Sequence, residues 1–283
     1  MIKIERNNLD VIASNYLKRL QGKRYYKSGK LVRGHFIDNM ERIVLATPKD
    51  FTTIVTEFTN KFKVQGAESS DDFKTYMENQ YNMMRGEHGY WLLNELNVKV
   101  CPYCNRQYTF TIKDKKVSPE LDHFYPKSKY PFLALSFYNL IPACSVCNHT
   151  KLEEEIDQNP YLVGFNDNSK FRMRTKDGND NSLDWALEKE IEIYFTNTNR
   201  NIDVFSLKEI YNEHIDFVKE IIDKAQAYNH SYYNSLIDSY KGLGKQEEDI
   251  DRFVWGNYLE KAEHEKRPLS KLTKDILQQL NLK

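Results

Sequence analysis

The sequence predicts an α+β protein that is mainly helical, with a small α/β segment near its middle. Apolar residues recur at helical spacing through residues 1–97 and again from Ser206 onward. Between these regions, two C-x2-C pairs and closely spaced prolines punctuate short β-rich runs. We therefore divide the chain into a helical N-terminal region at 1–97, a central module at 98–165, and a mixed, then helical region at 166–283.

The N-terminal region predicts several helices. The segment DNMERIVLATPKDFTTIVTEFTNKF (38–62) has apolar residues at helical spacing. Thr47-Pro48 marks a boundary inside it, because the residue before a proline is biased away from the helical conformation. The segments DDFKTYMENQYNMM (71–84) and YWLLNELN (90–97) continue the helical pattern.

The central module predicts two short extended segments and a helix. YTFTIK (108–113) alternates like a strand, and VSPELDH (117–123) reads as a second extended segment. After Cys147, the run NHTKLEEEI (148–156) looks like the start of a helix, because acidic residues fall in its early turns.

The C-terminal region begins with mixed patterns and then becomes helical. KFRMRT (170–175) and EIEIYF (190–195) alternate and are compatible with a hairpin or a short sheet. NSLDWALEKE (181–190), between them, is ambiguous. From Ser206 the pattern is helical, with a turn expected at KGLG (241–244).

The charge balance limits how the chain meets its partners. Lys plus Arg and Asp plus Glu both number 41, so the formal net charge is zero, whereas a free-standing nucleic-acid binder is often strongly basic. Any nucleic-acid contact must use local patches or a partner protein. The clearest patch is LKRLQGKRYYKSGKLVRG (17–34), which combines basic residues with two tyrosines. Such a run suits phosphate contact and base stacking, but a solvated loop or helix face is the alternative.

The sequence also predicts where the protein resides. No apolar run approaches the length of about 18 residues that a membrane span needs. The start of the chain, MIKIERNNLD, lacks the apolar core of a signal peptide. We therefore expect a cytoplasmic protein without a membrane partner.

The four cysteines form two C-x2-C pairs. A reducing compartment disfavours disulfides, whereas this spacing suits tetrahedral zinc with Zn–S distances of about 2.3 Å. Four thiolates leave no open coordination position, so we expect a structural Zn²⁺ that contributes folding energy. Iron is the alternative, since thiolates bind it too. The expected ligands are Cys101, Cys104, Cys144 and Cys147.

The span between the cysteine pairs contains groups suited to hydrolysis. Asp122 can hold a hard divalent cation, and a neutral His123 beside it can take a proton from water. Adjacent residues on a regular strand point to opposite faces. Both side chains reach one site only if the strand ends or bends there, and the flanking Pro119 and Pro126 make this credible.

At this point the motifs resemble a known family. A C-x2-C pair, then LDHFYPKS (121–128), then YNLIPAC-x-x-CN-x-x-K (138–151) closely resemble the HNH or ββα-metal endonucleases, in particular their zinc-stabilised branch. The resemblance covers about residues 98–152. A weaker similarity extends through NPYLVGF (159–165) to bacterial HNH proteins linked to phage defence. These include nuclease subunits that act beside an ABC-type ATPase, as in Septu-like systems.

The resemblance implies a role for each matching residue. Asp122 corresponds to the first metal ligand, His123 to the general base, and Asn139 to the middle asparagine that organises the loop and orients the base. The third family position directly follows the last zinc cysteine and is Asn148, which gives an H-N-N variant. His149 points about 100° away from Asn148 on a helix and is not expected to share its metal.

The donor types indicate which cation the second site would take. Oxygen ligands from Asp122 and Asn148 suit Mg²⁺ or Mn²⁺ better than zinc. Glu120 could be an outer metal ligand or a solvated strand residue. Three lysines are expected to contact phosphate, with plain surface exposure as the alternative: Lys127, Lys129 and Lys151.

The resemblance therefore implies a metal-dependent endonuclease that hydrolyses DNA, acting in phage defence with an ABC-type ATPase partner. Two alternatives stay open. One is a non-catalytic, zinc-stabilised module that binds nucleic acid or another protein, which needs the four cysteines but neither Asp122-His123 nor Asn148. The other is an RNase, because the same phosphodiester chemistry serves RNA.

Overall fold

A computed structural model of the 283-residue chain describes residues 2–21, 30–112, 119–164, 168–176, 190–228 and 230–282. Two expectations fall mostly outside these residues: the centre of the basic patch (22–29) and the ambiguous segment at 181–189. The chain divides into two compact units. The N-terminal unit comprises Lys3–Val98 and Thr109–Leu162, and the C-terminal unit comprises Met1–Ile2, Lys99–Tyr108 and Val163–Lys283.

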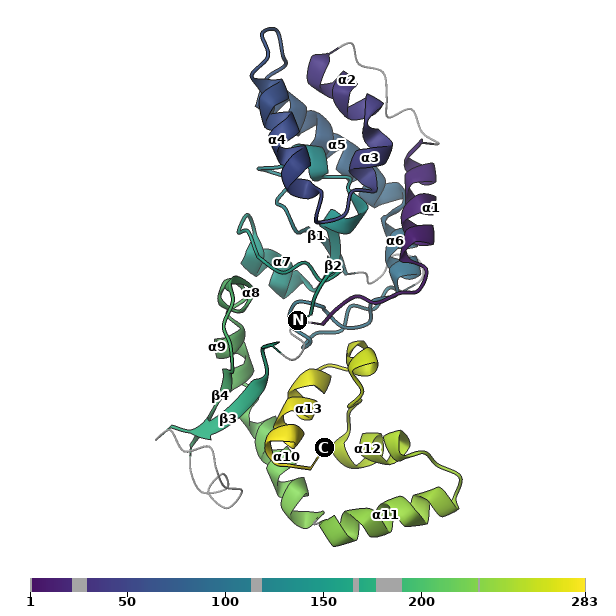
Figure 1. Cartoon of the computed structure of the whole chain (residues 1–283), viewed down its shortest axis with the longest axis vertical. Coiled ribbons are helices and arrows are strands. Elements are labelled where there is room, and N and C mark those ends of the chain that lie inside the picture. The colour runs from purple at the N-terminus through teal and green to yellow at the C-terminus, as the bar shows by residue number, and fades with distance from the viewer. Residues whose placement is uncertain are drawn as a thin grey trace. The chain divides into compact units, whose positions relative to one another are not determined.

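The N-terminal unit contains the helices expected before residue 97 (Figure 1). Thr47 and Pro48 lie between the third and fourth of them, as predicted. Ser69 caps the fifth helix, because its hydroxyl accepts a hydrogen bond from the Asp72 amide at 3.1 Å. The helices are α1 (Leu9–Gln21), α2 (Leu31–Asp38), α3 (Met40–Val44), α4 (Phe51–Phe62), α5 (Ser70–Glu87) and α6 (Gly89–Leu96).

Aromatic side chains join these helices to the middle of the chain. The rings of Phe58 on α4 and Phe132 stack with centroids 4.5 Å apart. Phe132 belongs to a short 3-10 helix, η2 (Pro131–Leu133). Phe73 on α5 packs against Phe58 at 6.0 Å. The helical region is therefore part of the core around the middle segment, which explains why they share one compact unit.

The middle of the chain forms two strands followed by a helix. β1 (Glu120–His123) pairs antiparallel with β2 (Leu140–Ala143), and α7 (Ser145–Lys151) follows β2 and packs against β1 (Figure 1). The middle segment therefore has the order strand, strand, helix. β1 coincides with the second extended segment predicted from the sequence.

Two local expectations for this segment were wrong, and one strand was missed. Residues 108–112 form no strand beyond an isolated bridge of Tyr108 with Val100, and the apolar face of this run is exposed rather than buried. The strand that pairs with β1 is instead β2, whose four residues are all buried and so show no alternation. Helix α7 starts at Ser145, before Cys147, and ends at Lys151, so the acidic residues follow the helix.

The C-terminal unit contains the predicted hairpin and a set of helices. β3 (Phe171–Thr175) and β4 (Ile191–Phe195) pair antiparallel, and each strand alternates between buried and half-buried residues. The backbone amide of Phe171 donates to Asp275 at 2.8 Å, which attaches the last helix to β3. The helices are α8 (Arg200–Val204), α9 (Leu207–Asn212), α10 (Ile215–Ala227), α11 (His230–Gly242), α12 (Glu247–Trp255), the 3-10 helix η5 (Lys261–Lys266) and α13 (Ser270–Gln279).

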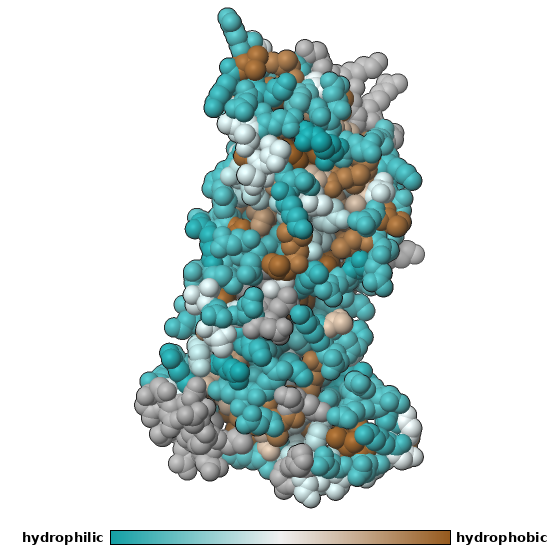
Figure 2. Space-filling view, viewed as in Figure 1, coloured by the Kyte–Doolittle hydropathy of each residue, from teal (hydrophilic) through white to brown (hydrophobic). Residues whose placement is uncertain are grey.

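The surface agrees with the composition. Hydrophilic residues predominate on the face shown in Figure 2, as expected for a chain with 29% charged residues. None of the helices in the described ranges combines the length and apolar content that crossing a bilayer requires.

Candidate functional site

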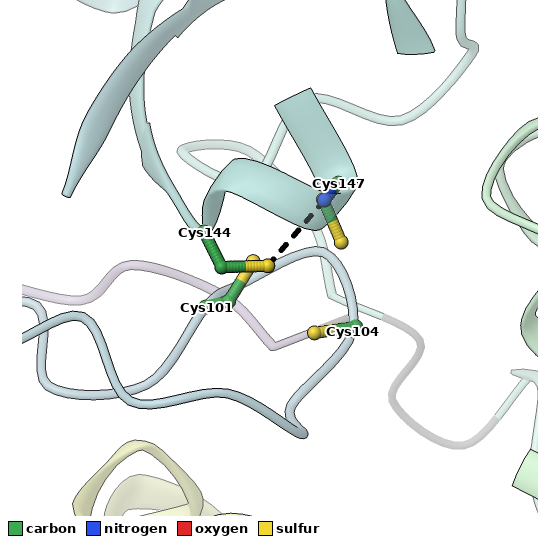
Figure 3. A group of neighbouring side chains, drawn as sticks. All are labelled: Cys101, Cys104, Cys144 and Cys147. Atoms are coloured by element: carbon green, nitrogen blue, oxygen red, sulfur yellow. Dashed lines mark hydrogen bonds between the residues drawn. The ribbon is translucent and has the colours of Figure 1, made fainter. Parts of the chain in front are cut away.

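The four cysteines come together as the spacing predicts. Their sulfur atoms all lie within 4.8 Å of one another, every one of the four residues is buried, and the side chains point toward a common centre (Figure 3). Zn–S bonds of about 2.3 Å in a tetrahedron require sulfur–sulfur distances of about 3.8 Å. The cluster therefore fits a structural zinc ion held by four thiolates.

Local backbone geometry explains how each pair is presented. The Cys101 amide donates to Gln107 O at 2.9 Å, and the Asn105 amide donates to Cys101 O at 2.8 Å. Asn105 adopts a left-handed conformation with φ of 49°, which closes this tight turn. In the second pair, Cys144 Sγ accepts the amide of Cys147 at 3.4 Å and thereby caps the start of α7.

A second candidate site is a cleft of about 510 Å³. All of its lining residues belong to the N-terminal unit. β1 ends at His123, so Asp122 and His123 both reach the cleft despite being neighbours on a strand. The lining residues important here are Lys74, Glu78, Tyr81 and Arg85 on α5, Glu120, Asp122 and His123 on β1, Lys127, and Asn148 and His149 on α7.

His123 is held as a neutral imidazole. Its side chain is buried, and Nε2 lies 3.0 Å from the carbonyl oxygen of Ala134. A carbonyl can only accept, so Nε2 carries the proton and Nδ1 is the basic nitrogen. Burial lowers the pKa of His123 to about 3, and the charges of Lys127 and Lys151 act in the same direction. The ring is therefore uncharged at neutral pH, as a proton acceptor must be.

Tyr81 packs against the other side of His123. The two rings meet edge to face with centroids 4.5 Å apart, and Tyr81 Oη donates to Leu121 O at 3.2 Å. The ammonium group of Lys127 lies 4.5 Å from the centroid of the Tyr81 ring. Sequence reasoning missed Tyr81. Its only signal is that Lys74, Tyr81 and Arg85 share a face of α5, which reads equally well as a solvated face.

Asn139 forms hydrogen bonds with the backbone of the loop after β1. Its Oδ1 accepts the Tyr125 amide at 2.7 Å, and its Nδ2 donates to Tyr125 O at 3.1 Å and to Leu133 O at 3.0 Å. Leu133 precedes Ala134, the residue that accepts the hydrogen bond from His123. Asn139 therefore reaches the imidazole through the loop rather than by direct contact.

Lys151 differs from the expected phosphate-contacting lysine. Its side chain is fully buried, and Nζ lies 3.3 Å from Asp122 Oδ1 and donates to His123 O at 2.6 Å. The reason is that the last turn of α7 packs on β1 and carries this side chain inward. Of the other two lysines, Lys127 lines the cleft, while Lys129 lies outside its lining and 3.8 Å from Glu155.

The first turns of α7 converge on Glu120. Asn148 Nδ2 donates to Glu120 Oε2, and His149 Nε2 lies 3.8 Å from Glu120 Oε1. The side chain of His149 is 74% exposed, consistent with the expected helix-surface position. Glu120 therefore contacts the candidate ligand Asn148 directly, as a residue supporting the site would.

The donor chemistry of the cleft fits a hard divalent cation. Two carboxylates, from Asp122 and Glu120, lie with the Asn148 amide in one cleft, and Mg²⁺ and Mn²⁺ prefer such oxygen donors. The cysteine group is nevertheless the only close His/Cys/Asp/Glu cluster in the described part of the chain. A cation at Asp122 and Asn148 would therefore exchange bonds with Lys151 and Glu120, rather than enter a preassembled cage.

Comparison with known proteins gives one informative match. The chain is 30% identical over 70 residues to the Septu protein PtuB of Bacillus thuringiensis. The match covers 25% of this chain and 26% of that protein, so the chain spans about a quarter of the length of the curated relative. No family model and no solved structure matches the chain. The similarity agrees with the weaker Septu-like resemblance of the sequence.

Proposed function

We propose that this protein is a metal-dependent endonuclease that hydrolyses phosphodiester bonds of DNA. One observation carries the proposal. A buried, neutral His123 and the Asp122 carboxylate are consecutive on β1, and both line one cleft together with Asn148 of α7. A proton acceptor beside oxygen donors is the minimum that hydrolysis of a phosphodiester requires.

The residues of the chain perform the proton transfer. Nδ1 of His123 takes a proton from water as the water oxygen bonds to phosphorus, and the bond to the leaving oxygen breaks. The Ala134 carbonyl fixes the imidazole through Nε2, and Asn139 fixes the loop that carries this carbonyl. A Mg²⁺ or Mn²⁺ ion held by Asp122 and Asn148 would stabilise charge on the phosphate and on the leaving oxygen.

The wider role that we propose is phage defence in the cytoplasm. The resemblance of the motif to Septu-like nuclease subunits and the partial match to PtuB support this role. The zero net charge favours a partner that brings the protein to DNA, and an ABC-type ATPase is the partner implied by the resemblance. Co-purification from the native host and a phage challenge with a His123→Ala strain test this part separately.

A cleavage assay tests the nuclease activity itself. Plasmid DNA, linear DNA and RNA are incubated with Mg²⁺ or Mn²⁺, with EDTA as the blank. Wild type is compared with His123→Ala and with His35→Ala, a histidine on α2 that bonds Glu57 and lies outside the cleft lining. Zinc content and melting temperature are measured for all three proteins. DNA cleavage lost only in His123→Ala supports the proposal.

The other outcomes separate the alternatives. Cleavage of RNA alone would make the protein an RNase. Equal cleavage by wild type and His123→Ala would exclude His123 as the general base. Binding of nucleic acid without cleavage, with the ATPase partner present, would favour the non-catalytic zinc-stabilised module.

A further inference from the structure

Helix α5 lines the cleft together with the strand–helix motif and forms one wall of it. Four of its residues line the cleft: Lys74, Glu78, Tyr81 and Arg85. Their spacing of four, three and four residues places them on one face of the helix. This helix lies outside residues 98–152, which carry the family resemblance, so the motif gives it no role.

Two of the basic side chains that line the cleft, Arg85 and Lys127, are held in position by neighbouring residues. Arg85 donates to Pro119 O at 2.9 Å, and a Cβ at Gly89 would approach its Nη1 to 2.5 Å, so Gly89 leaves room for the guanidinium. The Lys127 ammonium lies over the Tyr81 ring. Burial lowers the pKa of Lys127, and the charge of Glu78 opposes this shift. Lys74 is half-buried and has no ion pair with any residue in the described ranges.

The elements that line the cleft differ in charge. Helix α5 contributes two cations and one acid, Lys127 lies over Tyr81 of this helix, and β1 with the chain after α7 contributes three acids. A bound phosphodiester backbone needs cations along its length and the metal-binding carboxylates at one point only. The cations are Lys74, Arg85 and Lys127, and the three acids are Glu120, Asp122 and Glu153.

The length of this wall determines how many phosphates of a DNA strand it can contact. Lys74 and Arg85 are eleven residues apart, which corresponds to about 16 Å at about 1.5 Å per residue. Consecutive phosphates of one strand lie about 7 Å apart because the strand winds around the duplex axis as it rises about 3.4 Å per nucleotide, so a straight wall of this length spans about two to three phosphates. Tyr81, beside His123, lies about 6 Å from the Arg85 end and about 10 Å from the Lys74 end along the helix axis.

We infer that α5 binds the DNA backbone, with Arg85 contacting a phosphate about one nucleotide from the cleaved bond and Lys74 one about one to two nucleotides away on the other side. The inference rests on the proposed function for the position of the cleaved bond. The contacts themselves require only that the cleft holds a phosphodiester backbone.

Binding measurements with the full, zinc-loaded chain test the inference. Fluorescence anisotropy of a duplex DNA is recorded with Ca²⁺ over a range of salt concentrations. Lys74→Gln plus Arg85→Gln should weaken binding about tenfold and flatten the slope of log K against log salt by about 1.8, at about 0.9 per phosphate lost. Lys63→Gln, an exposed lysine outside the cleft lining, should keep the wild-type slope.

A second variant guards against misfolding. Arg85→Lys keeps the charge and should retain the salt slope of wild type, even if its affinity falls slightly. In cleavage assays, Lys74→Gln should raise KM with kcat within about twofold, because its contact is made equally in the ground and transition states.

The outcomes distinguish this inference from the nuclease proposal. An unchanged salt slope in the double variant, or a wild type that binds no DNA, overturns the α5 contact even if cleavage occurs. The expected loss of slope without cleavage sustains the contact and counts against the nuclease. The same loss of slope with RNA only would replace DNA as the ligand.

Discussion

The cysteine cluster and the cleft lined by α5 share neighbouring residues of the chain but hold their side chains in different ways. The four thiol groups are buried and lie close enough together to fill a tetrahedral zinc shell. The cleft groups instead satisfy one another: Asp122 pairs with Lys151, and Asn148 bonds Glu120. The two sites therefore differ in their bonding: the cysteines suit one closed metal shell, whereas the cleft residues pair with one another.

The largest effect should come from disrupting the cysteine cluster. Cys147→Ser removes one thiolate, so the zinc affinity and the folding energy that depends on it should fall together. We expect loss of zinc and a melting temperature lower by about 15 °C. Calorimetry with metal analysis measures both, and wild type stripped by a chelator should show the same decrease. Full stability without zinc would remove the contrast between the two sites.

The next largest effect should come from breaking the ion pair between Lys151 and the cleft residue Asp122. Lys151→Met leaves the buried Asp122 carboxylate without its ion pair, which costs about 3–5 kcal/mol. The melting temperature should fall by about 10 °C, and added Mg²⁺ or Mn²⁺ should restore part of the loss. Lys129→Met, at an exposed lysine near Glu155, should cost less than about 1 kcal/mol. Failure of cations to rescue Lys151→Met would argue that Asp122 binds none.

A smaller effect should follow from removing the ring beside His123. Tyr81→Leu deletes the edge-to-face contact, so the imidazole is held less accurately and kcat should fall about tenfold, with KM little changed. Tyr81→Phe keeps the ring and loses only the bond to Leu121 O, so its kcat should stay within about threefold. Equal losses in the two variants would show that the hydroxyl matters rather than the ring.

The smallest predicted effect is the pH dependence of stability through His264, whose backbone bonds the turn of the first cysteine pair. Asn105, in the turn between Cys104 and Gln107, donates to His264 O. Burial lowers the pKa of the His264 imidazole to about 4, while its bond to Leu259 O opposes this shift. The unfolded chain therefore takes up the proton first as pH falls, and stability is lost between about pH 6.5 and 4, by about 1 kcal/mol at pH 5.5.

Urea unfolding between pH 8 and 5.5 measures this loss, with zinc content checked at each pH. His264→Gln cannot take up the proton, so its stability should change less over this range than that of wild type. An identical pH slope in both proteins would show that His264 does not contribute to the acid response.

The sequence predicted the closed site more completely than the cleft. Cysteine spacing alone predicted that the four sulfurs meet, because two C-x2-C pairs are typical of a zinc site. The helices and the β3–β4 hairpin were confirmed because their faces alternate between buried and exposed. β2 was missed because all of its residues are buried, which erases the alternation.

The cleft was harder to predict because its parts are distant in sequence. Tyr81 meets Leu121 across 40 positions, and no local pattern marks this contact. Lys151 appeared to be a surface cation, and only the packing of α7 on β1 reveals that it is buried. The motif identified Asp122, His123, Asn139 and Asn148 as candidates, and their catalytic roles remain predictions.

One peptide bond separates Cys147 of the cluster from Asn148 of the cleft, and the sulfur of Cys144 caps the helix that carries both. Whatever strips or oxidises these thiolates would loosen the first turn of α7, and with it the amide that faces Glu120. The nuclease activity that we propose would then depend on zinc supply and on the redox state of these four thiols.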